Sequence, residues 1–230
     1  MYDAPVRHDT ARRGLRFLPV LAGVELAPPT RTRRVLPLAP GEVVLSFDDG
    51  PAPEATPAVL KALQAECVRA TFFMNGEPLL REPALARQVR ELGHSVGMHG
   101  HQHAHFASLP AAEQMADLGA MQAAYRQVFG TEAPAYRFPF LEETPTLLAA
   151  LQAQRITVMS VDAGIEDWLP DQTPPMLAER LAQRLRASRG GIVLLHDAQA
   201  QTAAALPLLL RTLKAQGWHV VHLDWAPPSP

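Results

Sequence analysis

The chain has 230 residues, of which 47% are hydrophobic and 19% are charged, a composition that excludes a disordered or fibrous protein. Its 21 basic and 23 acidic residues give a net charge of −2, so no general attraction for nucleic acid or an acidic membrane is expected. A single cysteine, Cys67, excludes an internal disulfide, and we expect it to lie in the core. No apolar run reaches the ~20 residues that a membrane-spanning helix requires.

The first forty residues differ in composition from the remainder, with seven arginines and no clear periodicity. A basic segment at residues 12–16 precedes an apolar stretch at 17–24, which is the order found in an export signal. Pro19 interrupts that stretch. We therefore interpret residues 1–40 as an N-terminal arm, with a weak export signal as the alternative, and residues 41–230 as one domain.

From residue 41 onward, apolar runs alternate with amphipathic segments. Strands are predicted at 43–47, 70–74, 95–98, 135–138, 156–161, 192–195 and 218–223. Helices are predicted from residue 56 and at 79–92, 111–129, 146–154, 175–187 and 202–216. In the helix at 111–129, the predicted inward residues are Met115, Leu118, Met121, Tyr125 and Val128. The alternation favours a parallel sheet with helical crossovers, either an α/β barrel or an open sheet.

Polar side chains gather directly after these predicted strands. They are Asp48 and Asp49 after the first, His99, His101, His103 and His105 after the third, Arg137 at the end of the fourth, Asp162 and Asp167 after the fifth, and His196 after the sixth. In an α/β barrel the carboxyl ends of the strands share one face, and that face carries the chemistry. We therefore expect a functional site there, with His196 as a candidate general acid or base.

The adjacent carboxylates and the histidine tract indicate a metal site. Neighbouring side chains on an extended backbone point in different directions, so one aspartate can bind a cation while the other handles a proton. His99 with His103, and His101 with His105, each have the spacing that lets two imidazoles share a metal. Spacing alone does not choose between these pairs. The alternatives are an aspartate that caps a turn and a histidine tract on the surface.

Five ordered motifs extend this pattern, and they span most of residues 42–223. They are Ser46–Pro51, Gly93–His99, Arg137–Phe140, Asp167–Trp168 and Leu194–Asp197. They resemble the motifs of the polysaccharide deacetylases of carbohydrate esterase family 4, which share the NodB homology domain. The resemblance implies a distorted, incomplete (β/α) barrel of about seven parallel strands. It also implies a hydrolase that removes N-acetyl groups from N-acetylglucosamine polymers or oligomers, such as chitin oligomers or peptidoglycan, and releases acetate.

The resemblance further implies a role for each motif residue. The metal ligands would be Asp49, His99 and His103, and they would hold one divalent ion, zinc or alternatively cobalt. The proton-transfer groups would be Asp48 as general base, tethered by Arg137, and His196 as general acid, paired with Asp167 or, as second choice, with Asp162. The substrate-binding groups would be the backbone N–H of Phe140, which would bind the oxyanion, together with Leu194 and Trp168.

Three positions depart from the family pattern, and so does the spacing of the fourth motif, in which Asp162 and Asp167 are five residues apart. Gly100 replaces a serine or threonine, Phe140 replaces a tyrosine, and Leu141 replaces a glycine. The alternative activities are an esterase acting on acetylated xylan and a deformylase acting on a formamido sugar, and an inactive carbohydrate-binding module is the alternative of another class. We expect a monomer whose partner is an N-acetylated glycan, located outside the cell or in its envelope, with the cytoplasm as the alternative.

Overall fold

The computed structural model describes residues 38–223, and residues 1–37 and 224–230 lie outside the described part of the chain. The predicted N-terminal arm and its alternative as an export signal therefore fall almost wholly outside the described residues. No helix among the described residues combines the length and the apolar character that crossing a membrane requires.

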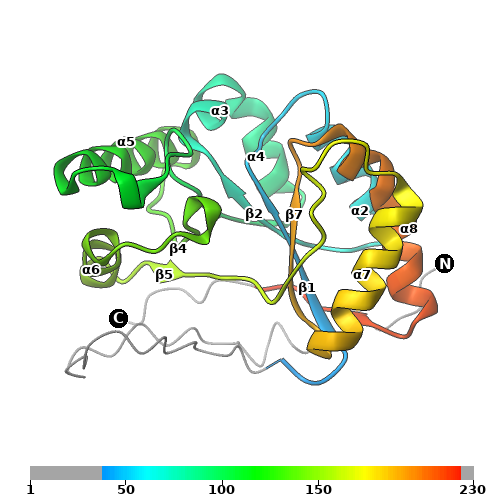
Figure 1. The fold of residues 1–230 in the computed structure, drawn as a ribbon. Coiled ribbons are helices and arrows are strands. Elements are labelled where there is room, and N and C mark those ends of the chain that lie inside the picture. The colour runs from blue at the N-terminus through cyan, green and yellow to red at the C-terminus, as the bar shows by residue number, and fades with distance from the viewer. Residues whose placement is uncertain (1–37, 224–230) are drawn as a thin grey trace.

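A curved, eight-stranded parallel sheet forms the centre of the molecule (Figure 1). Its strands are β1 (Glu42–Asp48), β2 (Thr71–Met74), β3 (Ser95–Met98), β4 (Ala135–Tyr136), β5 (Thr157–Val158), β6 (Ala163–Gly164), β7 (Gly191–His196) and β8 (His219–Val220). The order is β5-β4-β3-β2-β1-β7-β6, and β8 pairs with the start of β1. Because the order runs from β5 at one edge to β6 at the other, the sheet is an incomplete barrel, which confirms the predicted fold class.

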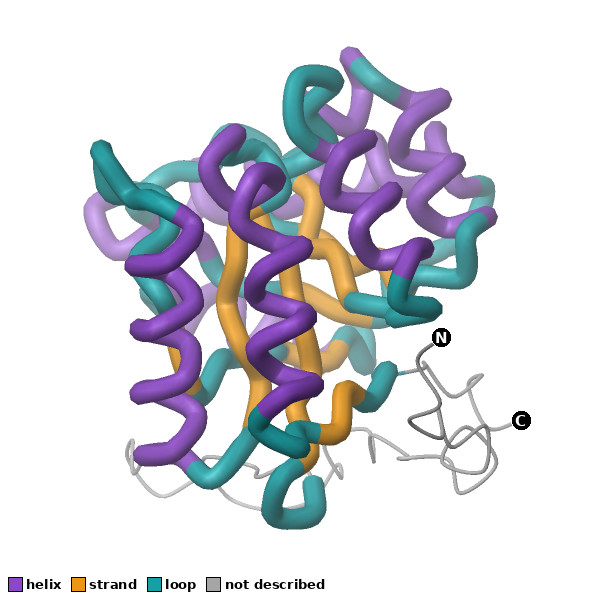
Figure 2. The backbone as a smooth tube through the Cα atoms, turned by 90° about the vertical axis from the view of Figure 1, so that its right-hand side faces the viewer, coloured by secondary structure: helices purple, strands orange, loops and turns teal. Residues whose placement is uncertain are grey.

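Helices cover the outside of this sheet (Figure 2). They are α2 (Thr56–Ala65), α3 (Gly76–Arg81), α4 (Pro83–Glu91), α5 (Ala111–Phe129), α6 (Pro145–Ala153), α7 (Pro174–Ser188) and α8 (Ala200–Ala215), with single 3₁₀ turns at Phe106–Ser108 and Pro139–Leu141. Helix α8 packs between α2 and α7, and α5 packs against α3 and α6. The strands therefore have a helical layer outside and a small interior of their own.

Successive side chains of β1 point alternately toward the helical layer and into the barrel. Val43, Leu45 and Phe47 are buried against the helices in the main core. Val44 instead packs with Phe73 and other residues inside the barrel. Side chains two apart share one face of a strand, so Ser46 and Asp48 also point into the barrel. The interior thus becomes polar toward the carboxyl end of β1.

The structure differs from the predicted elements at two places in the backbone. The predicted helix at 79–92 is two helices, because Pro83 has no amide hydrogen to continue α3 and instead begins α4. Strand β6 was not predicted, because its two residues, Ala163 and Gly164, form no apolar run. The seven predicted strands are all present, although β4, β5 and β8 are shorter than expected.

Two predicted core residues lie on the surface instead. Met115 is 41% exposed, since the first turn of α5 directs Gln114 inward. The Gln114 side chain donates to the Leu109 carbonyl at 2.8 Å and accepts from the Thr144 hydroxyl at 2.7 Å, so a polar residue is satisfied there. Cys67 is exposed in the turn after α2, where its φ of 53° directs Val68 into the core.

Candidate metal centre and active site

The two adjacent aspartates take different positions because the backbone turns between them. Asp48 is the last residue of β1, and its side chain is buried inside the barrel. Asp49 has a φ of 76°, in the left-handed region, and its side chain remains 26% exposed. The turn brings both carboxylates to the same imidazole, since Asp48 Oδ2 and Asp49 Oδ1 lie 3.6 Å and 3.5 Å from His99 Nε2, whereas the sequence predicts that they point in different directions.

Arg137, which directly follows β4, is completely buried and holds Asp48 in place. Its Nη1 donates to Asp48 Oδ1 at 2.6 Å and to the Ser46 hydroxyl at 2.9 Å. Its guanidinium lies 4.2 Å from the centroid of the Phe73 ring. Gly97 makes room for that ring, since a Cβ there would lie 2.7 Å from it. The Arg137 guanidinium is thus held by Ser46 on one side and by the Phe73 ring on the other, and it orients the Asp48 carboxylate.

Asp49, His99 and His103 offer ligand atoms that all lie within 4.8 Å of one another. Asp49 Oδ1 is 3.5 Å from Nε2 of His99 and 3.2 Å from Nε2 of His103. His99 directly follows β3, and its Nδ1 donates to the Arg137 carbonyl at 2.9 Å, which leaves the Nε2 lone pair free to bind a metal. Burial lowers the pKa of His99, although the charges of Asp48 and Asp49 oppose this.

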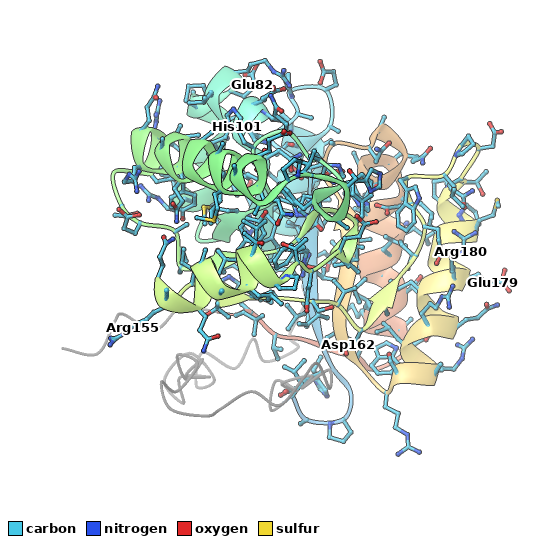
Figure 3. All side chains as sticks on the ribbon, turned by 60° about the vertical axis from the view of Figure 1, so that its left-hand side comes forward. Glu82, His101, Arg155, Asp162, Glu179 and Arg180 are labelled. Atoms are coloured by element: carbon cyan, nitrogen blue, oxygen red, sulfur yellow. The ribbon has the colours of Figure 1, made fainter. Side chains whose placement is uncertain are left out.

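The other two histidines of the tract lie elsewhere. The His101 ring rests against Gly76 at the start of α3, where a Cβ would collide with it, and Figure 3 shows His101 on this side of the molecule. Its amide donates to Asp117 at 2.8 Å. His105 stacks on Phe140 with ring centroids 3.7 Å apart, and its Nδ1 lies 3.1 Å from a Glu142 carboxylate oxygen. The structure thus brings only His99 and His103 of this tract to Asp49.

His196, the last residue of β7, pairs in register with Asp48 of β1. Its Nδ1 donates to Asp167 Oδ1 at 2.8 Å, and its backbone N–H donates to Asp167 Oδ2 at 2.8 Å. Asp162 instead accepts from the Ile192 amide at 2.9 Å, so the carboxylate that contacts His196 is Asp167. Burial lowers the pKa of His196, but the hydrogen bond and charge of Asp167, with the charges of Asp48 and Asp49, raise it overall to about 9.

The predicted substrate-binding residues surround these groups. Leu194 lies two residues before His196 on the same face of β7. Phe140 is 48% exposed and has a φ of 55°, and its ring meets the His103 ring edge to face with the ring centroids 4.4 Å apart. Trp168 is 45% exposed and packs its ring edge-on against His196 at 5.2 Å. Exposed aromatic faces therefore flank the site on the His103 side and on the His196 side.

A cleft of about 400 Å³ opens beside Asp49. It is lined by the loop after β1, by the end of α3 and by the loop after β7, with Asp49, Pro51, Ala52, Pro53, Glu54, Pro78, Arg81, Glu82 and Ala198 in its wall. The cleft therefore adjoins the group of Asp49, His99 and His103.

Several residues around the site were not found from the sequence. Thr202 donates to Asp167 at 2.6 Å, and Thr56 donates to the buried carboxylate of Asp197 at 2.5 Å. Burial raises the pKa of Asp197 to about 7. These partners are 35 and 141 residues apart, so no local pattern connects them. Gly100, one of the departures, has a φ of +77°, a conformation that favours glycine over serine or threonine.

Comparison with known proteins adds an independent observation. The family model described as polysaccharide deacetylase matches residues 37–159. The chitin deacetylase of Colletotrichum lindemuthianum is 30% identical over 232 residues, covering 93% of this chain and 93% of that protein. A peptidoglycan-N-acetylglucosamine deacetylase of Listeria monocytogenes is 29% identical and aligns with 91% of this chain, which spans only 42% of that relative. The solved peptidoglycan deacetylase of Bdellovibrio bacteriovorus superposes with a TM-score of 0.73 at 34% identity, covering 84% of this chain and 55% of that chain.

Proposed function

The chain belongs to the polysaccharide deacetylase family, and from this premise we propose that it hydrolyses the N-acetyl groups of N-acetylglucosamine units in a glycan polymer or oligomer. The observation that carries the proposal is the convergence of a metal-binding triad with two proton-transfer groups at one end of the barrel. The reaction breaks the amide C–N bond with water and leaves acetate and a glucosamine unit.

A divalent metal ion fits the triad of Asp49, His99 and His103. Asp49 Oδ1 is buried and has no hydrogen-bond partner among the residues that the structure describes, and it faces both Nε2 atoms. Two imidazoles and one carboxylate are the open donor set of catalytic zinc sites, so we propose zinc, with cobalt as the alternative. When bound, the ion supplies a Lewis acid that polarises the acetamide carbonyl and lowers the pKa of water.

Asp48 is the proposed general base. Arg137 holds Oδ1, which leaves Oδ2 on the side of the metal ligands, 3.6 Å from His99 Nε2. A water molecule that attacks the carbonyl beside the triad can therefore transfer its proton to Oδ2. Arg137 is the proposed tether, since it orients the carboxylate without reaching the substrate.

The remaining proposed roles concern the oxyanion and the leaving amine. The backbone N–H of Phe140 is the proposed oxyanion donor, and one such donor contributes about 3 kcal/mol to transition-state stabilisation. His196 is the proposed general acid. Asp167 accepts from its Nδ1, so Nε2 faces the site, 4.0 Å from Asp49 Oδ2, and protonates the departing amine. Leu194 is the proposed wall for the acetyl methyl group, and Trp168 the proposed contact for the sugar.

Acetate release from a panel of substrates tests this function. We expect turnover of chitin oligomers or peptidoglycan, since the relatives are named for these two polymers. Faster release from acetylated xylan would indicate the esterase, and faster release of formate from a formamido sugar would indicate the deformylase. Binding of these glycans without any release by the metal-loaded protein would indicate a carbohydrate-binding module and would refute the proposal.

Removal of the metal is expected to abolish acetate release. A chelator followed by dialysis should reduce turnover to background, because Asp49, His99 and His103 would then hold no Lewis acid beside the acetamide carbonyl. Adding zinc or cobalt should restore turnover, whereas adding magnesium should not, because magnesium prefers six oxygen ligands. Full turnover by protein that contains no metal on elemental analysis would contradict the mechanism.

We further propose that the protein acts as a monomer at the cell envelope or outside the cell. The support is that the site residues all come from one chain and that several relatives are named for peptidoglycan. If residues 1–40 contain the export signal that is the alternative to an N-terminal arm, N-terminal sequencing of the protein isolated from its native host should find a chain that begins near Gly23. An intact first residue on protein recovered from the cytoplasm would exclude export, and light scattering would detect a dimer.

A further inference from the structure

The loop between β6 and α7 delivers Asp167 and Trp168 to the site, and the residue before them is Glu166. Glu166 has a φ of 49°, in the left-handed region that is unfavourable for a residue with a Cβ. Such a conformation persists where the surroundings hold it, and it is a common feature of functional sites. The contacts of Glu166 identify what holds it here.

Two arginines of α7 form ion pairs with the Glu166 carboxylate. Arg180 Nε lies 3.2 Å from Oε2, and Arg184 Nη2 lies 2.9 Å from Oε1. Arg180 also reaches the main chain, since its Nη1 donates to the carbonyl of buried Ile165 at 2.6 Å. The Arg180 and Glu166 side chains are only 25% and 28% exposed, so solvent screens this contact less than it screens a surface pair. Helix α7 thus fixes both the backbone and the side chain of the loop immediately before Asp167.

The loop is held on its other side by α8. Thr202 donates to Asp167, and the Gln201 amide donates to the carbonyls of Asp167 and Leu169. The Asp167 side chain is completely buried between these contacts and His196. Helix α7 therefore contacts Ile165 and Glu166, and α8 contacts Asp167, the next residue along the chain.

We propose that Glu166, clamped by Arg180 and Arg184, is a positioning residue that sets Asp167 against His196 and Trp168 beside it. The proposal rests on the proposed role of His196 as general acid. Without the ion pairs to Arg180 and Arg184, the turn at Glu166 would relax. The hydrogen bond from His196 Nδ1 to Asp167 would then weaken, and His196 Nε2 would no longer be oriented toward the leaving amine. Ion pairs that served stability alone would leave this geometry unchanged.

The variant Glu166→Gly distinguishes a role in positioning Asp167 from a role in stability alone. Glycine suits a φ of 49°, so the change relieves the backbone while it removes the carboxylate. We expect kcat to fall roughly 10- to 100-fold, the cost of misplacing a catalytic group by up to an ångström, with KM and bound zinc nearly unchanged. We also expect the downfield proton NMR signal of the His196 Nδ1–H hydrogen bond to shift or broaden.

Arg180→Met removes the other half of the clamp and should reproduce this result, whereas Arg180→Lys should recover part of the loss. Glu179→Gln is the matched control, since it also lies on α7 but accepts only from Gln183 at 3.2 Å in the described structure, and Figure 3 shows it beside Arg180. It should retain kcat and the NMR signal. Glu166→Gln replaces Glu166→Gly if the glycine variant does not fold.

The NMR signal requires no substrate, so it tests positioning even if the wild-type protein releases no acetate. Wild-type kcat together with an unchanged signal in both Glu166→Gly and Arg180→Met would overturn the proposal. A lowered thermal midpoint with unchanged kcat and signal would do the same, because it would show a role in stability alone.

Discussion

Replacing Asp48 by asparagine is expected to leave the metal bound and to lower kcat by roughly 10²- to 10⁴-fold, the usual contribution of a general base. The carboxamide has nearly the shape of the carboxylate, and its oxygen still accepts from Arg137, which lies 2.6 Å from Oδ1 in the wild-type protein. It cannot take a proton from water. The measurements are acetate release and the zinc content after dialysis.

Asp49→Ala is the contrasting variant, and it should lose zinc because it removes a ligand of the triad. Asp48→Asn leaves the buried guanidinium of Arg137 without a charged partner, so its thermal midpoint should also fall. Activity is therefore compared at a temperature where circular dichroism shows both variants folded. Loss of zinc from Asp48→Asn, with zinc retained by Asp49→Ala, would mean that the two aspartates exchange roles.

The position of the site was predictable because it depends on strand ends. Most of the predicted strands are apolar runs, and parallel strands bring their carboxyl ends to one face whatever their order. Asp48, Arg137 and His196 could thus be placed together without knowledge of their contacts. The tertiary partners were not predictable: Thr202 meets Asp167, and Glu166 meets Arg180, through helix packing that no spacing along the chain encodes.

The wrong prediction at Met115 and the choice between Asp167 and Asp162, which the sequence leaves open, have the same origin. Met115 fits an apolar stripe, yet Gln114 takes the inward position because Leu109 and Thr144 satisfy its amide. The choice of Asp167 over Asp162 as the partner of His196 depends on the turn at Glu166, whose left-handed φ no propensity predicts for glutamate. The local sequence pattern therefore predicts where helices and strands lie. Hydrogen bonds between segments that are distant in the sequence decide which of two nearby side chains points inward or toward the site.

Substitutions in the histidine tract are expected to have a second large effect, on zinc affinity. His99→Ala and His103→Ala are each expected to lower zinc affinity by well over 100-fold, more than the loss of an outer hydrogen bond costs. Each removes an Nε2 that lies within 3.5 Å of Asp49 Oδ1. His101→Ala and His105→Ala should retain zinc near the wild-type level, because those rings contact Gly76 and Phe140 instead. Elemental analysis after dialysis against a weak chelator measures the difference.

The four variants control one another, since all remove an imidazole from the same seven residues. His105→Ala also removes the stacking partner of Phe140, so its activity is expected to fall while its zinc remains. His105→Ala is therefore expected to lose activity without losing zinc, whereas His99→Ala and His103→Ala are expected to lose both. If zinc were lost from His101→Ala or His105→Ala and kept by His99→Ala, the metal would sit on the alternative pair. In that case the short distances from Asp49 to His99 and His103 would reflect packing alone.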